Sequence, residues 1–356
     1  MNGLVTPRPK RATLRDVAAA TGLSQASVSY ALRGLHLPAP TQERVRQAAD
    51  ELGYEVNPSA RALALGRTGT IGVLCSSLED LWQQRLVVEL GRALLGEGRL
   101  TLIADAEGDL DRERTMVAQL SERQVDAAIV VPLNPAAPHW AELAEALPVI
   151  TIGDSLPGAA TAAEVLFDNR RGVAAGLTHL AELGHQRVAV LTPFQRSTPE
   201  RPAESLAIAE AGRLGVHLTL TCSPASIDGA ASVAADLLAG RPRPTAFFCL
   251  SDSMAYGVYL AAAERGLRVP RQLSVLGYDD HRMSRLVSPP LTTFRWDVDL
   301  IVVEAVRQVL AATEPVVIGD PLGAPLPSMR SRAHATRSVV RADFQLRGST
   351  GPAPRR

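Results

Sequence analysis

Polar side chains that could bind a small molecule follow several apolar runs between residues 70 and 280. They stand in the segments Cys75-Ser-Ser77, Ala104-Asp105, Pro132-Leu-Asn134, Gly153-Asp154, Thr192-Pro-Phe194, Ser251-Asp252 and Tyr278-Asp-Asp280. Hydroxyls and carboxylates with few cations suit a neutral polyol or sugar better than a phosphate, which needs cationic or backbone N–H donors. The glycine-rich phosphate loops GxGxxG and GxxxxGK[ST] are both missing from the sequence.

The apolar runs that precede these polar residues have the length of strands. The runs are 70–75, 100–104, 127–131 and 148–152, followed by a second series at 187–191, 215–219, 246–250 and 273–277. Amphipathic segments of helix length, such as 81–96 and 111–123, lie between them. This alternation predicts an α/β fold with parallel sheets covered by helices, and two series predict two lobes. Ligands of such sheets bind beyond the carboxyl ends of the strands, where the polar residues stand.

Catalytic and metal-binding patterns are missing. The seven histidines form no HxH or HExxH spacing, and no GxSxG nucleophile motif occurs. The three cysteines, Cys75, Cys222 and Cys249, form neither a metal-binding spacing nor a set of disulfide pairs. We therefore expect no enzyme activity, no metal and no cofactor.

Length and composition indicate a soluble chain of two or three domains. The protein has 356 residues, of which 46% are apolar and 21% charged. The N-terminus lacks the apolar segment of an export signal, and no run of residues is long and apolar enough to span a membrane. We expect the protein to reside in the cytoplasm, without membrane contact.

The zero net charge of the chain arises from two unlike parts. Residues 1–67 carry nine basic and five acidic side chains, whereas the rest of the chain carries 28 basic and 32 acidic ones. A basic head on an acidic body predicts that only the head contacts nucleic acid. A basic disordered tail with a chance excess of charge is the alternative.

Three short helices are predicted in the head. Thr13, with a carboxylate three residues later, begins the first, and Gly22 ends it. Ser24 can cap a second helix, and Thr41 can cap a third that Gly53 ends. The apolar side chains expected to form their common core are Leu23, Val28, Leu32, Val45, Ala48, Ala49 and Leu52. Two short helices joined by a glycine-containing turn are typical of a helix-turn-helix, whose second helix enters the major groove of DNA.

Several motifs of the head occur in a specific order and spacing. They are Thr13-Leu-Arg-Asp-Val-Ala18, Thr21-Gly-Leu-Ser24, Val28-Ser29, Thr41-Gln-Glu-Arg-Val45, Leu52-Gly-Tyr-Glu-Val-Asn-Pro58 and Ala60-Arg-Ala-Leu63. Together they resemble the DNA-binding head and hinge of the lactose-repressor (LacI) family of transcriptional regulators. The resemblance implies a homodimer that binds a pseudo-palindromic operator.

The resemblance also implies which residues contact DNA. Bases would be read by Gln25, Ala26 and Tyr30 of the second helix, and phosphates would be bound by Thr13, Ser24, Ser27, Ser29 and Thr41. Many members have an arginine at the place of Tyr30, and a tyrosine suits a thymine methyl better than a guanine. Arg33 replaces an asparagine that is usual in the family and adds an expected phosphate contact.

Residues 57–65 resemble the hinge helix of the family, which orders on operator binding. By resemblance, Leu63 is the residue that wedges into the minor groove and kinks the duplex. A plain linker with a core leucine is the alternative interpretation.

Further motifs extend the resemblance over nearly the whole chain. They are Phe167-Asp-Asn-Arg-Arg-Gly172, Leu183-Gly-His-Gln-Arg187, Ser251-Asp-Ser-Met-Ala-Tyr-Gly257, Leu267-Arg-Val-Pro270, Val275-Leu-Gly-Tyr-Asp-Asp280, Pro289-Pro-Leu-Thr-Thr293 and Leu346-Arg-Gly-Ser-Thr350. They imply the periplasmic-binding-protein-like core with which this family senses small-molecule effectors.

Four residues would bind the effector by the same resemblance. Arg201 stands where the family has an arginine that binds effector hydroxyls or a carboxylate, although the usual following glycine is missing. Asp279 matches an aspartate that bonds sugar hydroxyls, Ser251 replaces an asparagine, and Trp296 could stack on a sugar ring. The alternatives are an exposed arginine, an aspartate that caps a turn, and a tryptophan packed in the core.

These observations predict three parts of the chain. Residues 1–56 form the DNA-binding head, 57–69 the hinge, and 70–356 the effector-binding and dimerisation core. The first lobe is expected at 70–168 plus 295–312, and the second at 169–292 plus 315–350. The expected function is a transcriptional regulator, more often a repressor, whose operator binding is controlled by a small ligand. A two-lobed transport receptor and a metabolic enzyme are the competing hypotheses.

Overall fold

The computed structural model describes residues 12–32, 34–35, 37–54, 67–193, 203–314 and 335–354. It divides the chain into two compact units, Met1–Thr68 and Gly69–Arg356, which we call the head and the body. Three residues with a predicted role, Arg33, Leu63 and Arg201, lie outside the described residues, as does the predicted hinge helix.

The head contains the three predicted helices, α1 (Leu14–Thr21), α2 (Gln25–Leu32) and α3 (Ala39–Glu51). The backbone N–H of Thr13 donates to the Asp16 carboxylate at 2.7 Å, which secures the beginning of α1. Gly22 ends α1 with a φ of 70°, a left-handed conformation that glycine adopts without strain. At the start of α2, the Ser24 hydroxyl accepts the N–H of Ser27 at 3.1 Å. Local capping chemistry therefore determines both ends of α1 and the beginning of α2.

The third helix differs from the prediction at its beginning, whereas it ends before Gly53, whose φ is 60°, as predicted. Its N-cap is Pro38 rather than Thr41, because proline is well tolerated in a first helical turn and lets the helix begin two residues before Thr41. Leu52, expected in the core, follows the last helical residue and is 42% exposed. The side chains of Val17, Val28, Ala31 and Val45 form the fully buried centre of the head.

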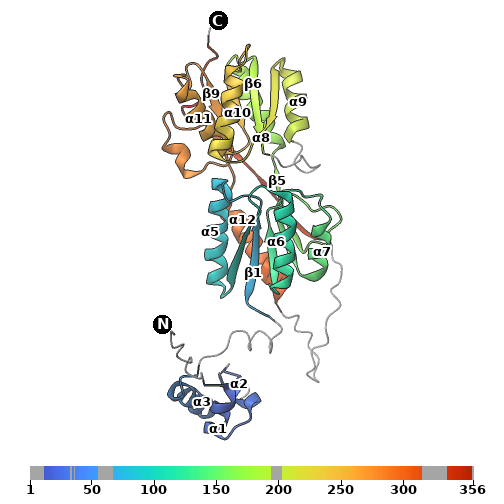
Figure 1. Ribbon diagram of the computed structural model, residues 1–356, viewed down its shortest axis with the longest axis vertical. Helices are drawn as coiled ribbons and strands as arrows, with labels where there is room; N and C mark the ends of the chain where they lie inside the picture. The colour runs from blue at the N-terminus through green and yellow to red at the C-terminus, as the bar shows by residue number, and fades with distance from the viewer. Residues whose placement is uncertain are drawn as a thin grey trace, which may run out of the picture. The chain divides into compact units, whose positions relative to one another are not determined.

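The first sheet of the body has six strands, all parallel to their neighbours. They lie in the order β11 (Thr336–Arg341), β5 (Ala163–Asp168), β4 (Val149–Gly153), β3 (Ala127–Val130), β1 (Thr70–Cys75) and β2 (Leu100–Asp105). The helices that cover it are α5 (Leu81–Gly96), α6 (Leu110–Glu122), α7 (His139–Ala146) and α12 (Val298–Thr313). Helices α5 and α12 contact each other on one face, and α6 and α7 do so on the other (Figure 1).

The second sheet has four parallel strands in the order β7 (His217–Cys222), β6 (Arg187–Thr192), β8 (Ala246–Cys249) and β9 (Ser274–Leu276). Its helices are α8 (Arg170–Glu182), α9 (Ala203–Leu214), α10 (Ile227–Ala239) and α11 (Asp252–Glu264), with a short 3-10 helix η1 at Arg282–Arg285. Helices α8 and α9 pack together on one face, and α10 and α11 pack together on the other (Figure 1). The predicted two-lobed α/β fold is confirmed.

The predicted assignment of residues 315–350 to the second lobe is wrong for residues 336–341, whereas Ser349 bonds the backbone of Val275 in the second lobe. Strand β11 pairs in parallel with β5 and therefore belongs to the first sheet. After β11 the chain forms β12 (Asp343–Gln345), which pairs antiparallel with the earlier strand β10 (Thr293–Arg295). The chain then reaches the second lobe, where the N–H of Ala353 donates to the carbonyl of Leu183. The sequence did not predict that β11 belongs to the first sheet, because its partner strand β5 lies about 170 residues earlier in the chain.

Within the described part of the chain, no helix has the length and apolar character needed to cross a membrane.

Candidate functional site

A cavity of about 290 Å³ lies where the carboxyl ends of strands from both sheets meet. Its first-lobe wall includes Ser76, Ser77, Asp80, Trp82, Gly153 and Phe167, and its second-lobe wall includes Thr192, Ala225, Leu250, Ser251, Tyr278 and Asp279. Trp296, between β10 and α12, completes the lining. A pocket of this size and lining is suited to a compact small molecule that contacts both lobes.

The cavity brings together most of the polar segments that follow the strands. Residues of the segments at 75–77, 132–134, 153–154, 192–194, 251–252 and 278–280 line it. Asp105, Asp154, Asp252 and Asp280 do not, although the sequence offered them as candidates. Of the four residues predicted to bind an effector, Ser251, Asp279 and Trp296 are on the wall, and Arg201 lies outside the described residues.

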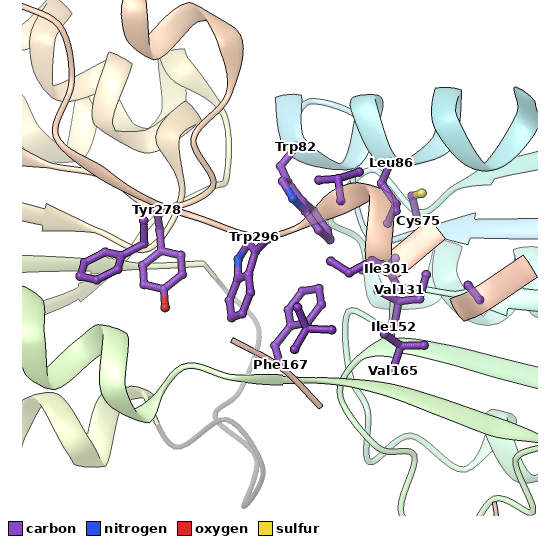
Figure 2. Close-up of a cluster of buried hydrophobic side chains, with 14 of the residues drawn as sticks. Cys75, Trp82, Leu86, Val131, Ile152, Val165, Phe167, Tyr278, Trp296 and Ile301 are labelled. Atoms are coloured by element: carbon purple, nitrogen blue, oxygen red, sulfur yellow. The ribbon is translucent and has the colours of Figure 1, made fainter. Parts of the chain in front are cut away.

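Aromatic rings form the apolar side of the cavity (Figure 2). The ring of Trp296 stacks on Phe167 with centroids 4.4 Å apart and an angle of 22°, and it lies 5.3 Å from the ring of Tyr278. Trp82 meets Phe167 edge to face at 5.4 Å. Because Phe167 covers one face of Trp296, a ligand can reach only its other face or its edge. Sequence reasoning missed Trp82, whose position just after the cap of a predicted helix could have revealed it.

Two helix caps join the lobes at the cavity. The Asp80 carboxylate accepts the N–H of Trp82 at 2.8 Å and thereby caps α5, and the Ser251 hydroxyl accepts the N–H of Ser253 at 3.1 Å and caps α11. The Ser251 hydroxyl also donates to Asp80 at 3.0 Å, and the N–H of Leu81 donates to the Ser253 hydroxyl at 3.0 Å. The N-termini of α5 and α11 are thus tied to each other across the lobes.

Asp279 is held in an unusual conformation on the cavity wall. Its φ of 120° is in the region that favours glycine, and its carboxylate accepts the N–H of Asp252 at 3.4 Å. Burial raises the pKa of Asp279, and the neighbouring carboxylates of Asp80 and Asp252 raise it further. Burial likewise raises the pKa of Asp80, against the effect of its cap hydrogen bonds.

Asp252 ties together the second lobe behind the cavity. Its carboxyl group accepts hydrogen bonds from the Thr293 hydroxyl at 2.6 Å, the backbone of His281 at 2.9 Å and the Ser284 hydroxyl at 2.5 Å. Burial raises its pKa to about 7, in spite of these hydrogen bonds. The carboxylate that the sequence placed beside the ligand therefore serves the internal structure of the lobe.

Three residues that line the cavity each have a buried polar atom without a hydrogen-bond partner among the described residues. These atoms are the indole nitrogen of Trp82, the amide oxygen of Asn169 and the hydroxyl of Tyr278. Buried polar atoms without a partner are costly, so binding sites are where they are tolerated. Together they offer a donor, an acceptor and a group that can act as either, which fits a ligand with several hydroxyl groups.

The residues predicted to contact DNA lie on and beside α2. Gln25, Ala26 and Tyr30 are exposed, and Tyr30 is 42% accessible. The hydroxyls of Ser24 and Ser27 bond each other at 2.9 Å. The hydroxyl of Thr13 donates to Asp16, and Thr41 is half-buried in the first turn of α3.

The sequence matches a periplasmic binding protein-like domain over residues 177–331. It is 30% identical over 291 residues to the HTH-type transcriptional regulator GalS of Salmonella typhimurium, a match that covers 80% of this chain and 85% of GalS. The match therefore covers most of this chain and most of GalS.

Solved structures agree with this match. The lac repressor dimer bound to operator and the anti-inducer ONPF superposes with a TM-score of 0.74 and 25% identity, over 96% of this chain and 100% of that one. A LacI family regulator of Enterococcus faecium with bound ribose has a TM-score of 0.65 at 23% identity, over 80% of this chain and 99% of that one, which is a likeness of fold. The chain therefore belongs to the LacI family of transcriptional regulators.

Proposed function

We propose that this regulator is a repressor whose operator binding is controlled by a small polyhydroxylated effector in the cavity between the lobes. The observation that supports it most is the cavity itself, whose lining combines hydroxyls, carboxylates and aromatic rings from both lobes. A relative of the same fold has ribose bound, which supports a sugar or related metabolite as the class of ligand.

In this proposal, Asp279 and Ser251 bond effector hydroxyls, and Arg201 adds further hydrogen bonds to the ligand. Trp296 contributes its edge or the face that Phe167 leaves uncovered. The operator is read by Gln25, Ala26 and Tyr30, with Thr13, Ser24, Ser27, Ser29, Arg33 and Thr41 on phosphates and Leu63 in the minor groove. Such a regulator works where the chromosome is, so we place it in the cytoplasm.

The protein would act as a homodimer on a pseudo-palindromic operator. Large apolar side chains are exposed along neighbouring elements of the first lobe, with Val88 at 48% and Leu95 at 64% on α5, and Leu100 at 63% and Ile103 at 50% on β2. Exposed apolar side chains on neighbouring elements support a second copy of the chain as the partner of this part of the first lobe.

The effector would change DNA affinity through the arrangement of the lobes. Because the cavity has walls from both lobes, a bound ligand stabilises the lobe arrangement that it fits best. The first lobe begins directly after the predicted hinge, so a change in that lobe would alter the order of the hinge residues and the spacing of the two heads. Operator and effector must change each other's affinity by the same factor.

Binding to DNA from the protein's own promoter tests the proposal. We expect the purified protein to prefer this duplex over a scrambled duplex of equal length, with an affinity that falls as salt rises. Because the head has an excess of only four positive charges, the salt dependence should be moderate. Equal affinity for both duplexes at every salt concentration would refute the regulatory function.

A further inference from the structure

The walls of the cavity are acidic. Among the described residues that line it, five have a carboxyl group and none has a cationic side chain; the five are Glu79, Asp80, Glu107, Glu204 and Asp279. Glu79 and Glu107 are exposed, and Glu107 forms an ion pair with Arg112 at 2.7 Å. Asp80 and Asp279 are different, because they are only 6% and 7% exposed. They present two carboxyl groups to one enclosed space, one from each lobe.

The described residues balance these two carboxylates unequally. The Ser251 hydroxyl lies beside both and donates to Asp80 at 3.0 Å. Since a hydroxyl has a single proton, it cannot donate to both carboxylates at once. The backbone N–H of Asp252 donates to the Asp279 carboxylate over a long distance of 3.4 Å. The Asp80 carboxylate also accepts the N–H groups of Trp82 and Gln83 at the N-terminus of α5, so Asp279 is the less satisfied of the two and the one that attracts a positive charge.

A second feature of the same wall points to a ligand that has donors. The amide oxygen of Asn169 is an acceptor without a partner among the described residues, and its side chain is buried at 9% exposure. Tyr278 and Trp296 place aromatic rings in the same lining; Phe294 stacks on Tyr278 and Phe167 on Trp296, so only the uncovered face of each ring can attract a cation. A cavity of about 290 Å³ is at the small end of ligand sites, which favours a compact occupant.

We propose that the effector is a hydroxylated ring compound with a protonated amine, of the amino-sugar class, and that its ammonium group binds between Asp80 and Asp279. The proposal rests on the proposed function in that it uses the same cavity. Burial and the neighbouring carboxylates raise the pKa of Asp279, so the empty site favours a bound proton there. An ammonium group provides the same charge together with three hydrogen-bond donors, and it would replace that proton.

Sugars of the same ring type with a positive charge, no charge or a negative charge test this inference. The probes are glucosamine, galactosamine and mannosamine, each against its neutral parent sugar, its N-acetyl derivative and a sugar acid of the same ring, glucuronate or galacturonate. Binding to the full-length protein is measured by thermal shift and by calorimetry. We expect at least one amine to bind about tenfold more tightly than its neutral parent, because a charge-assisted hydrogen bond is stronger than a neutral one.

Two variants locate the charge recognition. Asparagine, like aspartate, tolerates a positive φ, so Asp279→Asn is expected to fold. Asparagine can also cap a helix, so Asp80→Asn is expected to fold with α5 intact. Each variant should reduce the preference for the amine over the neutral sugar by about tenfold. The affinity for the neutral sugar should change much less. Glu264→Gln, an exposed carboxyl on α11 away from the cavity, is the matched control and should preserve the preference.

The outcomes separate this inference from the regulatory function. Tighter binding of neutral sugars or sugar acids, or no binding of any amine, overturns the ammonium site. If the protein still prefers its promoter DNA and a neutral sugar releases it from that DNA, the proposed function stands without the ammonium site. Conversely, selective binding of an amine by a protein that shows no DNA preference supports the site and refutes the regulator.

Discussion

The hydroxyl of Ser251 in the second lobe donates to the carboxylate of Asp80 in the first lobe at 3.0 Å, although the two residues are 171 positions apart. Each of them also caps the helix that follows it, α11 for Ser251 and α5 for Asp80. One hydrogen bond thus connects two helix termini, the two lobes and the wall of the cavity.

A double-mutant cycle measures this connection. We expect Ser251→Ala alone to lower the free energy of unfolding by about 1 kcal/mol, since it removes a cap and a hydrogen bond to a carboxylate. Combined with Asp80→Ala in urea titrations, the two changes should couple by roughly 1 kcal/mol or more, while the cap contributions cancel. Strict additivity would mean that the bond across the lobes contributes nothing to stability.

Tyr278→Phe separates ligand binding from folding. The hydroxyl of Tyr278 is buried without a partner among the described residues, and Gly172 leaves the space that it occupies. Its removal should leave the free energy of unfolding unchanged or raise it by about 1 kcal/mol, because an unsatisfied polar group is lost. Effector affinity should fall about threefold to tenfold in calorimetry. A variant that is clearly less stable and binds normally would contradict this assignment.

Helices α10 and α11 pack closely at Gly257. A Cβ atom at this position would come within 2.4 Å of the carbonyl of Ile227 and 2.6 Å of the N of Ala231. Gly257→Ala should therefore cost roughly 1–3 kcal/mol in the free energy of unfolding. Gly212 in α9 has nothing within 4 Å of such a Cβ, so Gly212→Ala is the control and should stabilise by about 0.5–1 kcal/mol. Similar melting temperatures for both variants would argue against the close packing.

The pH dependence of stability should report on Asp252. Its pKa rises from the ordinary value of 3.8 to about 7 in the folded protein. Between these values the folded state binds more protons than the unfolded state, so this group reduces the free energy of unfolding as the pH rises.

Comparison with Asp252→Asn isolates that effect. The stability of the wild type relative to this variant should decline between about pH 4 and pH 7 and level off above pH 7, in urea titrations at fixed salt. Asp343→Asn, at a side chain that is 73% exposed, is the surface control. Parallel pH profiles for the two variants would rule out a raised pKa at Asp252.

Dimer formation should depend on the apolar surface of α5 and β2. Leu95→Glu replaces a side chain that is 64% exposed in the single chain, so the fold should tolerate it. Burying the new charge in a dimer interface would be costly, so we expect a shift toward monomer in sedimentation velocity and a parallel loss of operator affinity. Leu286→Glu, 79% exposed on the second lobe, is the matched control. A dimer unaffected by Leu95→Glu would place the interface elsewhere.

The sequence by itself determined the features that depend on neighbours in the chain. The capping residues Thr13 and Ser24 and the stop at Gly22 located α1 and α2, and the amphipathic period located α5 with both of its ends. The alternation of strands and helices determined the two lobes and, through the carboxyl ends of the strands, the side of the sheets on which Ser251 and Asp279 would meet a ligand.

Only the tertiary structure decided which distant residues meet. Strand β11 joined the first sheet, Phe167 covered one face of Trp296, and Asp252 turned inward while Asp80 joined the cavity. The physical reason is that caps and periodicity act within a few residues along the chain. Strand order and contacts between lobes depend instead on how the chain crosses from one lobe to the other, a choice made by the packing of the whole body.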